Sequence, residues 1–172
     1  NRRIEAVVED ADRLQTLQAL AAVEEERRLK WPQAADAYLR MLEIDAEAPT
    51  AYRALERLYM THEQWGAAEA LLARETPHLT GKEQLAVLVR RVELRATRLQ
   101  DAAGALALAE DVLARNRQEK SVRELVARLL DDPQVKVRAA AMLEPIYEAE
   151  RRYKELVGVL RIAVEHEAPG PG

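Results

Sequence analysis

The chain of 172 residues contains no cysteine and no phenylalanine, and only six glycines and seven prolines. The lack of cysteine excludes a disulfide framework, a thiolate metal site and a cysteine nucleophile. No apolar run approaches the roughly 18 residues that a membrane-spanning helix needs, and no signal peptide precedes the first expected helix. We therefore expect a cytoplasmic protein without membrane insertion.

The chain also lacks a large excess of charge of either sign, because its net charge is only −4. The basic footprint expected of a nucleic-acid-binding protein is therefore missing at the level of the whole chain. By contrast, 48% of the residues are hydrophobic and 33% are charged, which suits a folded chain with a substantial core. We expect a single domain over residues 1–168 and a linker-like tail, Pro-Gly-Pro-Gly, over residues 169–172.

Two further features concern the origin of the chain. It starts with Asn-Arg-Arg rather than methionine, which leads us to expect a piece of a longer protein. Only five of the 26 basic residues are lysine. The resulting preference for arginine is typical of a GC-rich bacterial genome.

Residues 49–75 carry the clearest pattern in the chain. In the first half, Tyr52, Leu55 and Tyr59 are spaced three and four residues apart, which puts them on one face of a helix. A matching apolar face in the second half is formed by Trp65, Ala68, Leu71 and Leu72. The four residues 61–64 between the two halves are enough only for a tight antiparallel return. This stretch predicts a helical hairpin.

The same period of apolar residues continues through the rest of the chain. It predicts further helices over residues 4–30, 31–44, around 85–96, around 105–113, 122–130, 135–148 and 153–166. Asp101 is the expected N-cap of the helix around 105–113. The clearest break falls at residues 76–81, which contain both Pro77 and Gly81. About nine helices and no strands are expected.

The hairpin of residues 49–75 recurs later in the chain. A shift of 88 residues aligns Ala51, Leu55, Glu56, Tyr59, Trp65 and Leu72 with Ala139, Leu143, Glu144, Tyr147, Tyr153 and Leu160. With this spacing of aromatic and small residues, the chain resembles the tetratricopeptide-repeat family. All seven Trp and Tyr residues fall at motif positions of that family. The resemblance implies an all-α, right-handed α-solenoid of antiparallel helices.

The resemblance covers residues 14–167 and is divergent. Glu56, Glu93 and Glu144 stand where the family has a small residue at the closest helix contact. Each either reaches an arginine of a neighbouring hairpin or is solvated between splayed helices. The helix of residues 122–130 is additional to the 34-residue period of the family. Residues 130–141 resemble the inter-helix turn of a HEAT repeat, which suggests a mixed solenoid.

In tetratricopeptide arrays the first helices of successive hairpins line a concave groove. Carried over residue by residue, the resemblance implies a partner-binding groove made by Arg53, Arg57, Met60, Arg90, Leu94, Arg98 and Arg138. Thr16, Val23 and Arg27 of the first hairpin would join them. Guanidinium groups bind carboxylates bidentately, so the expected occupant is an acidic or C-terminal peptide segment of a partner protein. The alternative is that these arginines pair with Glu56, Glu93 and other local acids.

Residues suited to catalysis or metal binding are sparse. His62, His78 and His166 have no acidic or histidine partner at a convincing ligand spacing. The three isolated glycines Gly66, Gly81 and Gly104 do not form a phosphate-binding loop. Glu24, Glu25 and Glu26 precede two arginines and indicate a solvated helix face. We expect no enzyme, no cofactor and no metal.

Two functions remain open at this stage. The first is a protein-interaction scaffold that binds a partner peptide or helix in the concave groove. The second is a structural spacer of a larger repeat protein that stacks or self-associates through its terminal helices, for which exposed Val7, Val8 and Leu14 would provide the contact. Nucleic-acid binding is the weakest alternative, because basic and acidic residues interleave and no aromatic is left over for base stacking.

Overall fold

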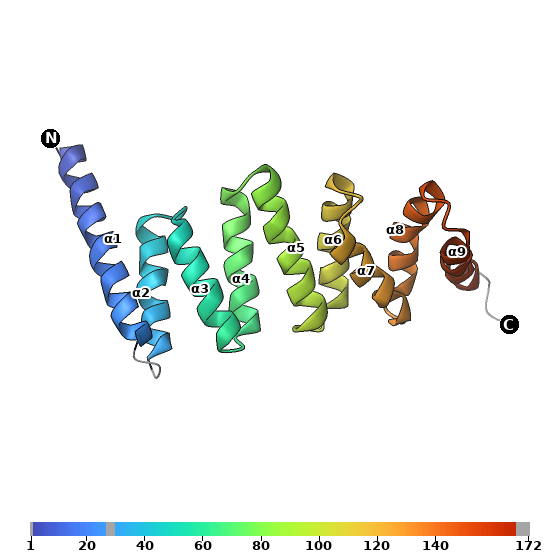
Figure 1. Ribbon diagram of the computed structural model, residues 1–172, viewed down its shortest axis with the longest axis horizontal. Helices are drawn as coiled ribbons and strands as arrows, with labels where there is room; N and C mark the ends of the chain where they lie inside the picture. The colour runs from blue at the N-terminus through green and yellow to red at the C-terminus, as the bar shows by residue number, and fades with distance from the viewer. Residues whose placement is uncertain (1, 27–29, 168–172) are drawn as a thin grey trace. The chain divides into compact units, whose positions relative to one another are not determined.

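The computed structural model describes residues 2–26 and 30–167, which form nine α-helices and two 3-10 helices and contain no strand (Figure 1). The α-helices are α1 (Arg2–Glu26), α2 (Trp31–Ile44), α3 (Pro49–Thr61), α4 (Trp65–Glu75), α5 (Gly81–Thr97), α6 (Ala102–Arg115), α7 (Lys120–Arg128), α8 (Lys136–Ala149) and α9 (Tyr153–Glu167). The 3-10 helices are η1 (Thr76–His78) and η2 (Leu129–Asp131). The predicted all-α helical-repeat fold is confirmed, and the right-handed superhelix stays a prediction.

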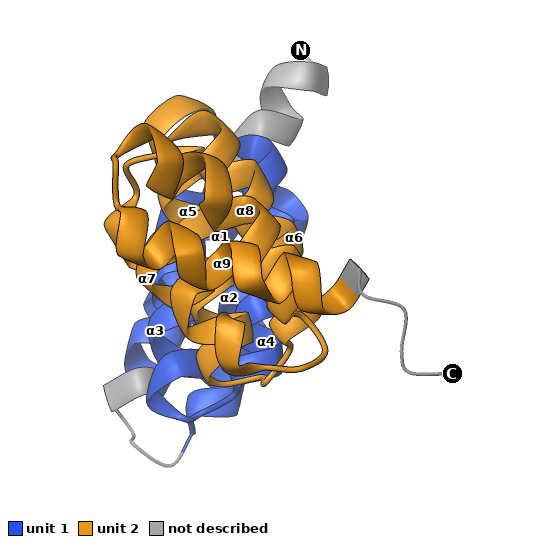
Figure 2. Ribbon diagram, turned by 90° about the vertical axis from the view of Figure 1, so that its right-hand side faces the viewer, with its two compact units in different colours: residues 1–79 blue, residues 80–172 orange. Residues whose placement is uncertain are grey.

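The chain divides into two compact units, Asn1–Leu79 and Thr80–Gly172, which we call unit 1 and unit 2 (Figure 2). The division falls inside residues 76–81, where the sequence predicted its clearest break. There η1 ends at His78, and α5 begins at Gly81 with a φ of 55°, in the left-handed region that favours glycine. A single domain over residues 1–168 stays a prediction, and the tail lies outside the described residues.

Unit 1 consists of four helices in which each packs on the next, from α1 to α4. Ala34, Ala51 and Leu55 are fully buried in its core. At the surface, the indole of Trp31 stacks on the imidazole of His62 with ring centroids 4.5 Å apart, which ties the start of α2 to the end of α3. The Arg74 guanidinium donates to the Leu42 carbonyl at 2.8 Å and so caps the C-terminal end of α2 from α4.

Unit 2 contains the hairpins α5–α6 and α8–α9, joined by the short helix α7. Helix α7 contacts α5, α6 and α8. Val122 and Val126 on α7 are fully buried in the same core as Val92 of α5 and Leu143 of α8. Helix α7, which the sequence predicted as a helix additional to the repeats, therefore joins the two hairpins of unit 2 into one core.

Three hairpins share one type of turn. Glu63, Gln100 and Arg151 have φ values of 56°, 54° and 56°, and each lies just after the first helix of its hairpin. In two of these turns the amide of the next residue donates to a carbonyl five residues back: Gln64 to Tyr59 and Arg152 to Tyr147. Such left-handed residues are a common way to end a helix. Glu63 and Arg151 are related by the same shift of 88 residues that the sequence showed.

The positions predicted from the sequence were confirmed at several helix ends. Helix α2 spans the predicted residues 31–44. Asp101 caps α6 by accepting a hydrogen bond from the Gly104 amide at 2.9 Å. A Cβ at position 104 would collide with the Asp101 carboxylate and the Arg95 guanidinium, so a larger residue there would require both side chains to move. Helix α7 begins two residues earlier than predicted, and the predicted last residues 129–130 tighten into η2 instead.

The three glutamates at the small-residue positions, Glu56, Glu93 and Glu144, are all partly buried. The chain therefore accommodates a carboxylate at each of these contacts without full solvation. Which arginine each one reaches stays a prediction. The side chains of Val7 and Val8, and all of Arg27, lie outside the described part of the chain. Leu14 is partly buried against the core of unit 1 rather than exposed.

Candidate polar pocket between α7 and α8

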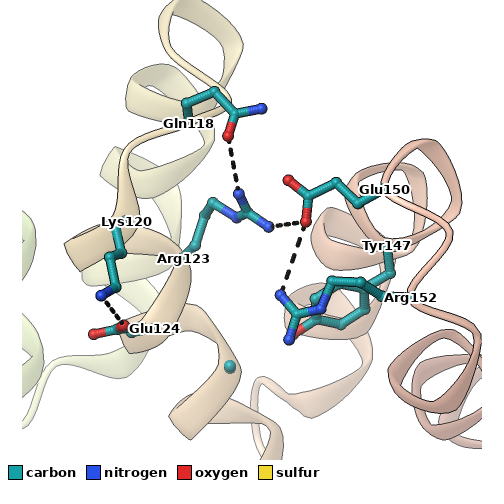
Figure 3. Close-up of a pocket in the computed structure, with 8 residues that line it drawn as sticks. Gln118, Lys120, Arg123, Glu124, Tyr147, Glu150 and Arg152 are labelled. Carbon is teal, nitrogen blue, oxygen red and sulfur yellow. Dashed lines mark hydrogen bonds and ion pairs between the residues drawn. The ribbon is translucent and has the colours of Figure 1, made fainter.

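A polar pocket of about 450 Å³ lies in unit 2, between α7 and the turn that joins α8 to α9 (Figure 3). We call it the α7–α8 pocket. Its lining residues are Gln118, Lys120, Arg123, Glu124, Ala127, Tyr147, Glu150 and Arg152. This volume falls within the ~300–1,000 Å³ that ligand pockets commonly have.

Helix α7 supplies one wall because its lining residues repeat at helical spacing. Lys120, Arg123, Glu124 and Ala127 lie three and four residues apart and so share one face of the helix. On the opposite face, Val122 and Val126 anchor α7 in the core. The polar face of α7 is thus held toward the pocket by the burial of its apolar face.

Arg123 joins the two walls of the pocket. Its Nη2 lies 2.5 Å from Oε2 of Glu150, and its Nη1 donates to Oε1 of Gln118 at 3.4 Å (Figure 3). The Arg123 side chain is only 14% exposed. An arginine fixed by two partners at this depth is a rigid part of the pocket wall rather than a mobile surface charge.

Arg152 reaches the pocket because of the turn after α8. The left-handed Arg151 reverses the chain, and the Arg152 guanidinium then lies over the Tyr147 ring, 4.7 Å from its centroid. The same guanidinium donates to Oε1 of Glu155 at 2.7 Å and lies 3.8 Å from Oε2 of Glu150. A cation over an aromatic face and between two carboxylates is held in one orientation.

These contacts keep the acidic groups of the pocket ionised. The hydrogen bond from Arg123, more than the nearby charge of Arg152, lowers the pKa of Glu150 below its ordinary 4.5. The hydrogen bond from Arg152 lowers the pKa of Glu155 and raises that of Arg152 itself. Carboxylates with lowered pKa values are ionised near neutral pH and accept charge-assisted hydrogen bonds from the arginines beside them.

The charge balance of the pocket differs from that of the chain. Three basic residues, Lys120, Arg123 and Arg152, face two acidic ones, Glu124 and Glu150. Lys120 pairs with Glu124 at 3.6 Å, but both side chains are largely exposed and the pair is open to solvent. The lining residues thus carry one net positive charge in a chain of net charge −4. Glu155, which lies outside the lining but accepts a hydrogen bond from Arg152, balances that charge. An incoming carboxylate would find Lys120 and Arg152 at the rim.

The predicted groove residues lie elsewhere, and they divide between the two units. Arg53, Arg57 and Met60 are exposed along one face of α3 in unit 1. Arg90 is exposed on α5, and Arg98 is exposed directly after α5. None of these five lines the α7–α8 pocket.

Two predicted groove residues are poorly placed for an open groove. Leu94 is only 5% exposed, because the buried apolar face of α5 extends to it. Arg138 donates to Oε1 of Glu110 at 3.0 Å, so it makes the internal pair that the sequence left open as the alternative. Thr16 and Val23 are exposed on α1.

Of the residues that line the α7–α8 pocket, the sequence singled out only Tyr147, and it did so as a repeat position rather than as a binding residue. Arg123 and Glu150 are 27 residues apart, and no local spacing connects them. One signal was available: the shift of 88 residues aligns Arg152 with Gln64, so the later hairpin has a charge where the earlier one has an amide. This departure from the repeat marks the position that forms the rim.

The histidines do not gather into a metal site. His62 stacks on Trp31, and Nδ1 of His78 lies 3.7 Å from Oε1 of Glu47. His166 lies in the last turn of α9. Among the residues that the structure describes, no group of three or more potential ligands could hold a metal ion. Within the same residues, no helix is both long and apolar enough to cross a membrane.

The chain was compared with known proteins. No family model matches the chain, and no curated protein matches it significantly. Among solved structures, the chain is similar to YrrB, described as a TPR protein with an unusual peptide-binding site. The two are 15% identical with a TM-score of 0.45, over 95% of this chain and 91% of that one.

Proposed function

We propose that this chain is a non-enzymatic protein-interaction scaffold that captures an acidic segment of a partner protein in the α7–α8 pocket. The observation that carries the proposal is the pair of cations at the rim, Lys120 and Arg152, of which Arg152 is held over the Tyr147 ring. Side-chain carboxylates of the segment would bind these two cations. The lysine and the arginine supply charge-assisted hydrogen bonds, which are stronger than neutral ones.

Rigidity supports this proposal. Gln118, Arg123, Glu150, Arg152 and Glu155 form a continuous series of hydrogen bonds and ion pairs across the pocket. A site whose side chains are already ordered loses less conformational entropy when a ligand binds. Arg123 then has a positioning role, and Lys120 and Arg152 contact the ligand.

The experiment is a selection of random peptides with free C-termini, displayed on phage, against the full chain. Selected peptides are expected to be rich in Asp and Glu, and their affinity is expected to fall as salt rises. In fluorescence anisotropy, the double variant Lys120→Gln/Arg152→Gln should bind the best peptide at least about tenfold more weakly, which corresponds to ~1.4 kcal/mol. Circular dichroism checks that the variant is folded.

The matched control is Arg117→Gln/Arg161→Gln, which removes the same charge from exposed residues of the same unit that do not line the pocket. It should bind the peptide as the wild type does. If both double variants lost the same amount of peptide affinity, the interaction would be general electrostatic attraction rather than binding in the pocket. A selection without acidic enrichment would contradict the proposal outright.

The exposed arginines of α3 and α5 are a second place where the same function could reside. Reversing two of them in Arg57→Glu/Arg90→Glu should leave the selected peptide bound if the α7–α8 pocket captures it. Loss of binding in this folded variant, with Lys120→Gln/Arg152→Gln unaffected, would move the site to the predicted groove.

The second candidate function is that of a structural segment that associates through its ends. The observation that favours it is a row of exposed apolar side chains on α9, where Tyr153 and Val164 are about two-thirds exposed. Apolar side chains gathered on one helix face typically mark a surface that another element covers.

A further inference from the structure

Helix α9 has an apolar face besides the one that packs on α8. Val159 of α9 is buried in the core, whereas Tyr153, Val157, Leu160 and Val164 are exposed by 66%, 56%, 39% and 64%. These four follow a spacing of four, three and four residues, which places them in one line along the helix, as in the seam of a coiled coil. We call them the α9 stripe.

A groove of similar length runs along the other end of the chain, between α1 and α2. Two adjoining cavities of about 460 and 410 Å³ lie between these helices, and both contact Arg40. Together they extend on α1 from Asp12 to Glu24, which is about 18 Å at ~1.5 Å per residue. Leu17, Leu20 and Ala37 give the groove an apolar lining. We call it the α1–α2 groove.

The α9 stripe and the α1–α2 groove match in length. From Tyr153 to Val164 the stripe spans eleven residue-to-residue steps along the helix, about 17 Å at ~1.5 Å per residue. An amphipathic helix with apolar residues at this spacing is the usual occupant of an apolar groove between two helices. The groove belongs to unit 1 and the stripe to unit 2, and each is complete within its own unit.

Their charges are complementary as well. The groove is bordered by the acids Asp12, Glu24, Asp36 and Glu43 and by only two arginines, Arg13 and Arg40. The stripe is flanked on one side by the exposed Lys154 and Arg161. Lys154 and Arg161 are seven residues apart on α9, and so are Asp36 and Glu43 on α2. Both pairs therefore span about two helical turns, or ~10 Å.

One buried acid in the groove is incompletely satisfied. Oε2 of Glu24 is buried and accepts no hydrogen bond from any residue that the structure describes. It lies 3.7 Å from Nζ of Lys30, an ion pair without a hydrogen bond. A buried carboxylate oxygen without a donor is costly, and a lysine or arginine entering the groove would supply one.

We propose that the α9 stripe of one copy of this chain binds in the α1–α2 groove of a second copy. The contact is head-to-tail, since the two surfaces are different and lie in different units. Such a contact leaves one stripe and one groove unoccupied at the two ends of each assembly, so it extends into a chain of copies or closes into a ring. This inference develops the second candidate function and does not depend on peptide capture.

The test measures the mass of the full chain by sedimentation and light scattering over a dilution series. The weight-average mass of the wild type should rise with concentration. Val157→Asp disables the stripe and Leu20→Asp disables the groove, so each variant alone should lose this rise. An equimolar mixture retains one intact stripe and one intact groove, and it should form a dimer and nothing larger.

Two further variants serve as controls. Val23→Asp makes the same kind of change at an α1 residue that is 47% exposed, as Leu20 is, but does not line the groove. It should associate as the wild type does, which separates loss of the groove from added charge or altered folding. Lys120→Gln/Arg152→Gln should also associate normally, so that failure of peptide capture and failure of self-association are told apart.

A charge exchange tests the pairing without changing an apolar residue. Lys154→Glu/Arg161→Glu should lose association, and combining it in the same chain with Asp36→Lys/Glu43→Lys should restore association. The proposal is overturned if the wild type keeps the monomer mass at every concentration, which would mean that the stripe does not bind a second copy. It is equally overturned if Leu20→Asp alone still associates, because the stripe would then pair with something other than the groove.

Discussion

Glu150 is the residue on which the geometry of the α7–α8 pocket depends most. It accepts a hydrogen bond from Arg123 on α7 and lies beside Arg152 of its own turn, so one carboxylate orients both arginines. The bond from Arg123 is the largest cause of its lowered pKa. A pKa lowered in the folded state means that ionised Glu150 favours folding.

The pH dependence of stability should report this contact. Because the folded-state pKa lies below the ordinary 4.5, the contribution of Glu150 is complete above pH 4.5 and is lost as the pH falls through the folded value. At pH 7 the wild type should therefore be more stable than Glu150→Gln, and at pH 3 the difference should shrink toward zero. Urea unfolding followed by circular dichroism at both values measures this difference.

Glu148→Gln provides the reference for that comparison. Glu148 is an exposed glutamate two residues away on α8, outside the pocket lining. Its effect on stability should change little between the two pH values. If the effect of Glu150→Gln on stability were also the same at pH 7 and pH 3, the Arg123 contact would contribute nothing to the stability of the folded chain in solution.

Whether the sequence could predict the contact of a single residue depended on how far apart the two contacting residues lie along the chain. Asp101 was predicted as an N-cap because its partner, the Gly104 amide, is three residues away and the helix begins between them. Arg123 and Glu150 are too far apart for such an argument, and their contact depends on how α7 packs against α8. Arg138 could not be assigned either, since its pairing with Glu110 requires the arrangement of α6 and α8.

At the scale of the helical hairpin, the shared turn has an energetic consequence. Glu63, Gln100 and Arg151 are all non-glycine residues at positive φ. A left-handed conformation costs an L-residue roughly 1–2 kcal/mol, which glycine avoids at some cost in unfolded-state entropy. These hairpins therefore retain backbone strain that a glycine at the left-handed position would remove.

Gln100→Gly should accordingly stabilise unit 2 by about 0.5–1 kcal/mol, the net of the removed strain and the added chain entropy. The measurement is the midpoint of urea unfolding by circular dichroism. Ala107→Gly, an exposed position in the interior of α6, should shift the midpoint the opposite way, since glycine destabilises a helix interior by roughly 0.5–1 kcal/mol. A destabilised Gln100→Gly variant would show that the Gln100 side chain contributes more than its backbone costs.

Helices were the most predictable elements because their evidence is local. The apolar period and the flanking prolines located α2 and both helices of the hairpin α3–α4. The period on α9 was also visible, but it could not show that the side chains of Tyr153, Val157 and Val164 are exposed. Trp65, aligned with Tyr153, is partly buried whereas Tyr153 is exposed, so equivalent positions in the repeat have different surroundings.

On the scale of the whole molecule, the two units have separate cores. The core of unit 1 is built from residues of α1 to α4, and that of unit 2 from residues of α5 to α9. Sequence periodicity registers helices and turns, so it could not predict how the buried apolar residues divide between these two cores. Separate cores make independent unfolding the expected behaviour of the chain.

Tryptophan fluorescence can test this independence in the full chain, because both tryptophans, Trp31 and Trp65, belong to unit 1. Leu55 and Leu143 are equivalent under the shift of 88 residues, and each is fully buried in the core of its own unit. Truncating either to alanine should cost about 2–5 kcal/mol. Leu55→Ala should lower the urea midpoint of the fluorescence transition, which reports on unit 1. Leu143→Ala should leave that midpoint unchanged and should lower only the urea midpoint at which unit 2 loses its circular dichroism signal. If the units unfolded as one, Leu143→Ala would shift the fluorescence midpoint as much as Leu55→Ala, because a single cooperative transition shares every loss of stability.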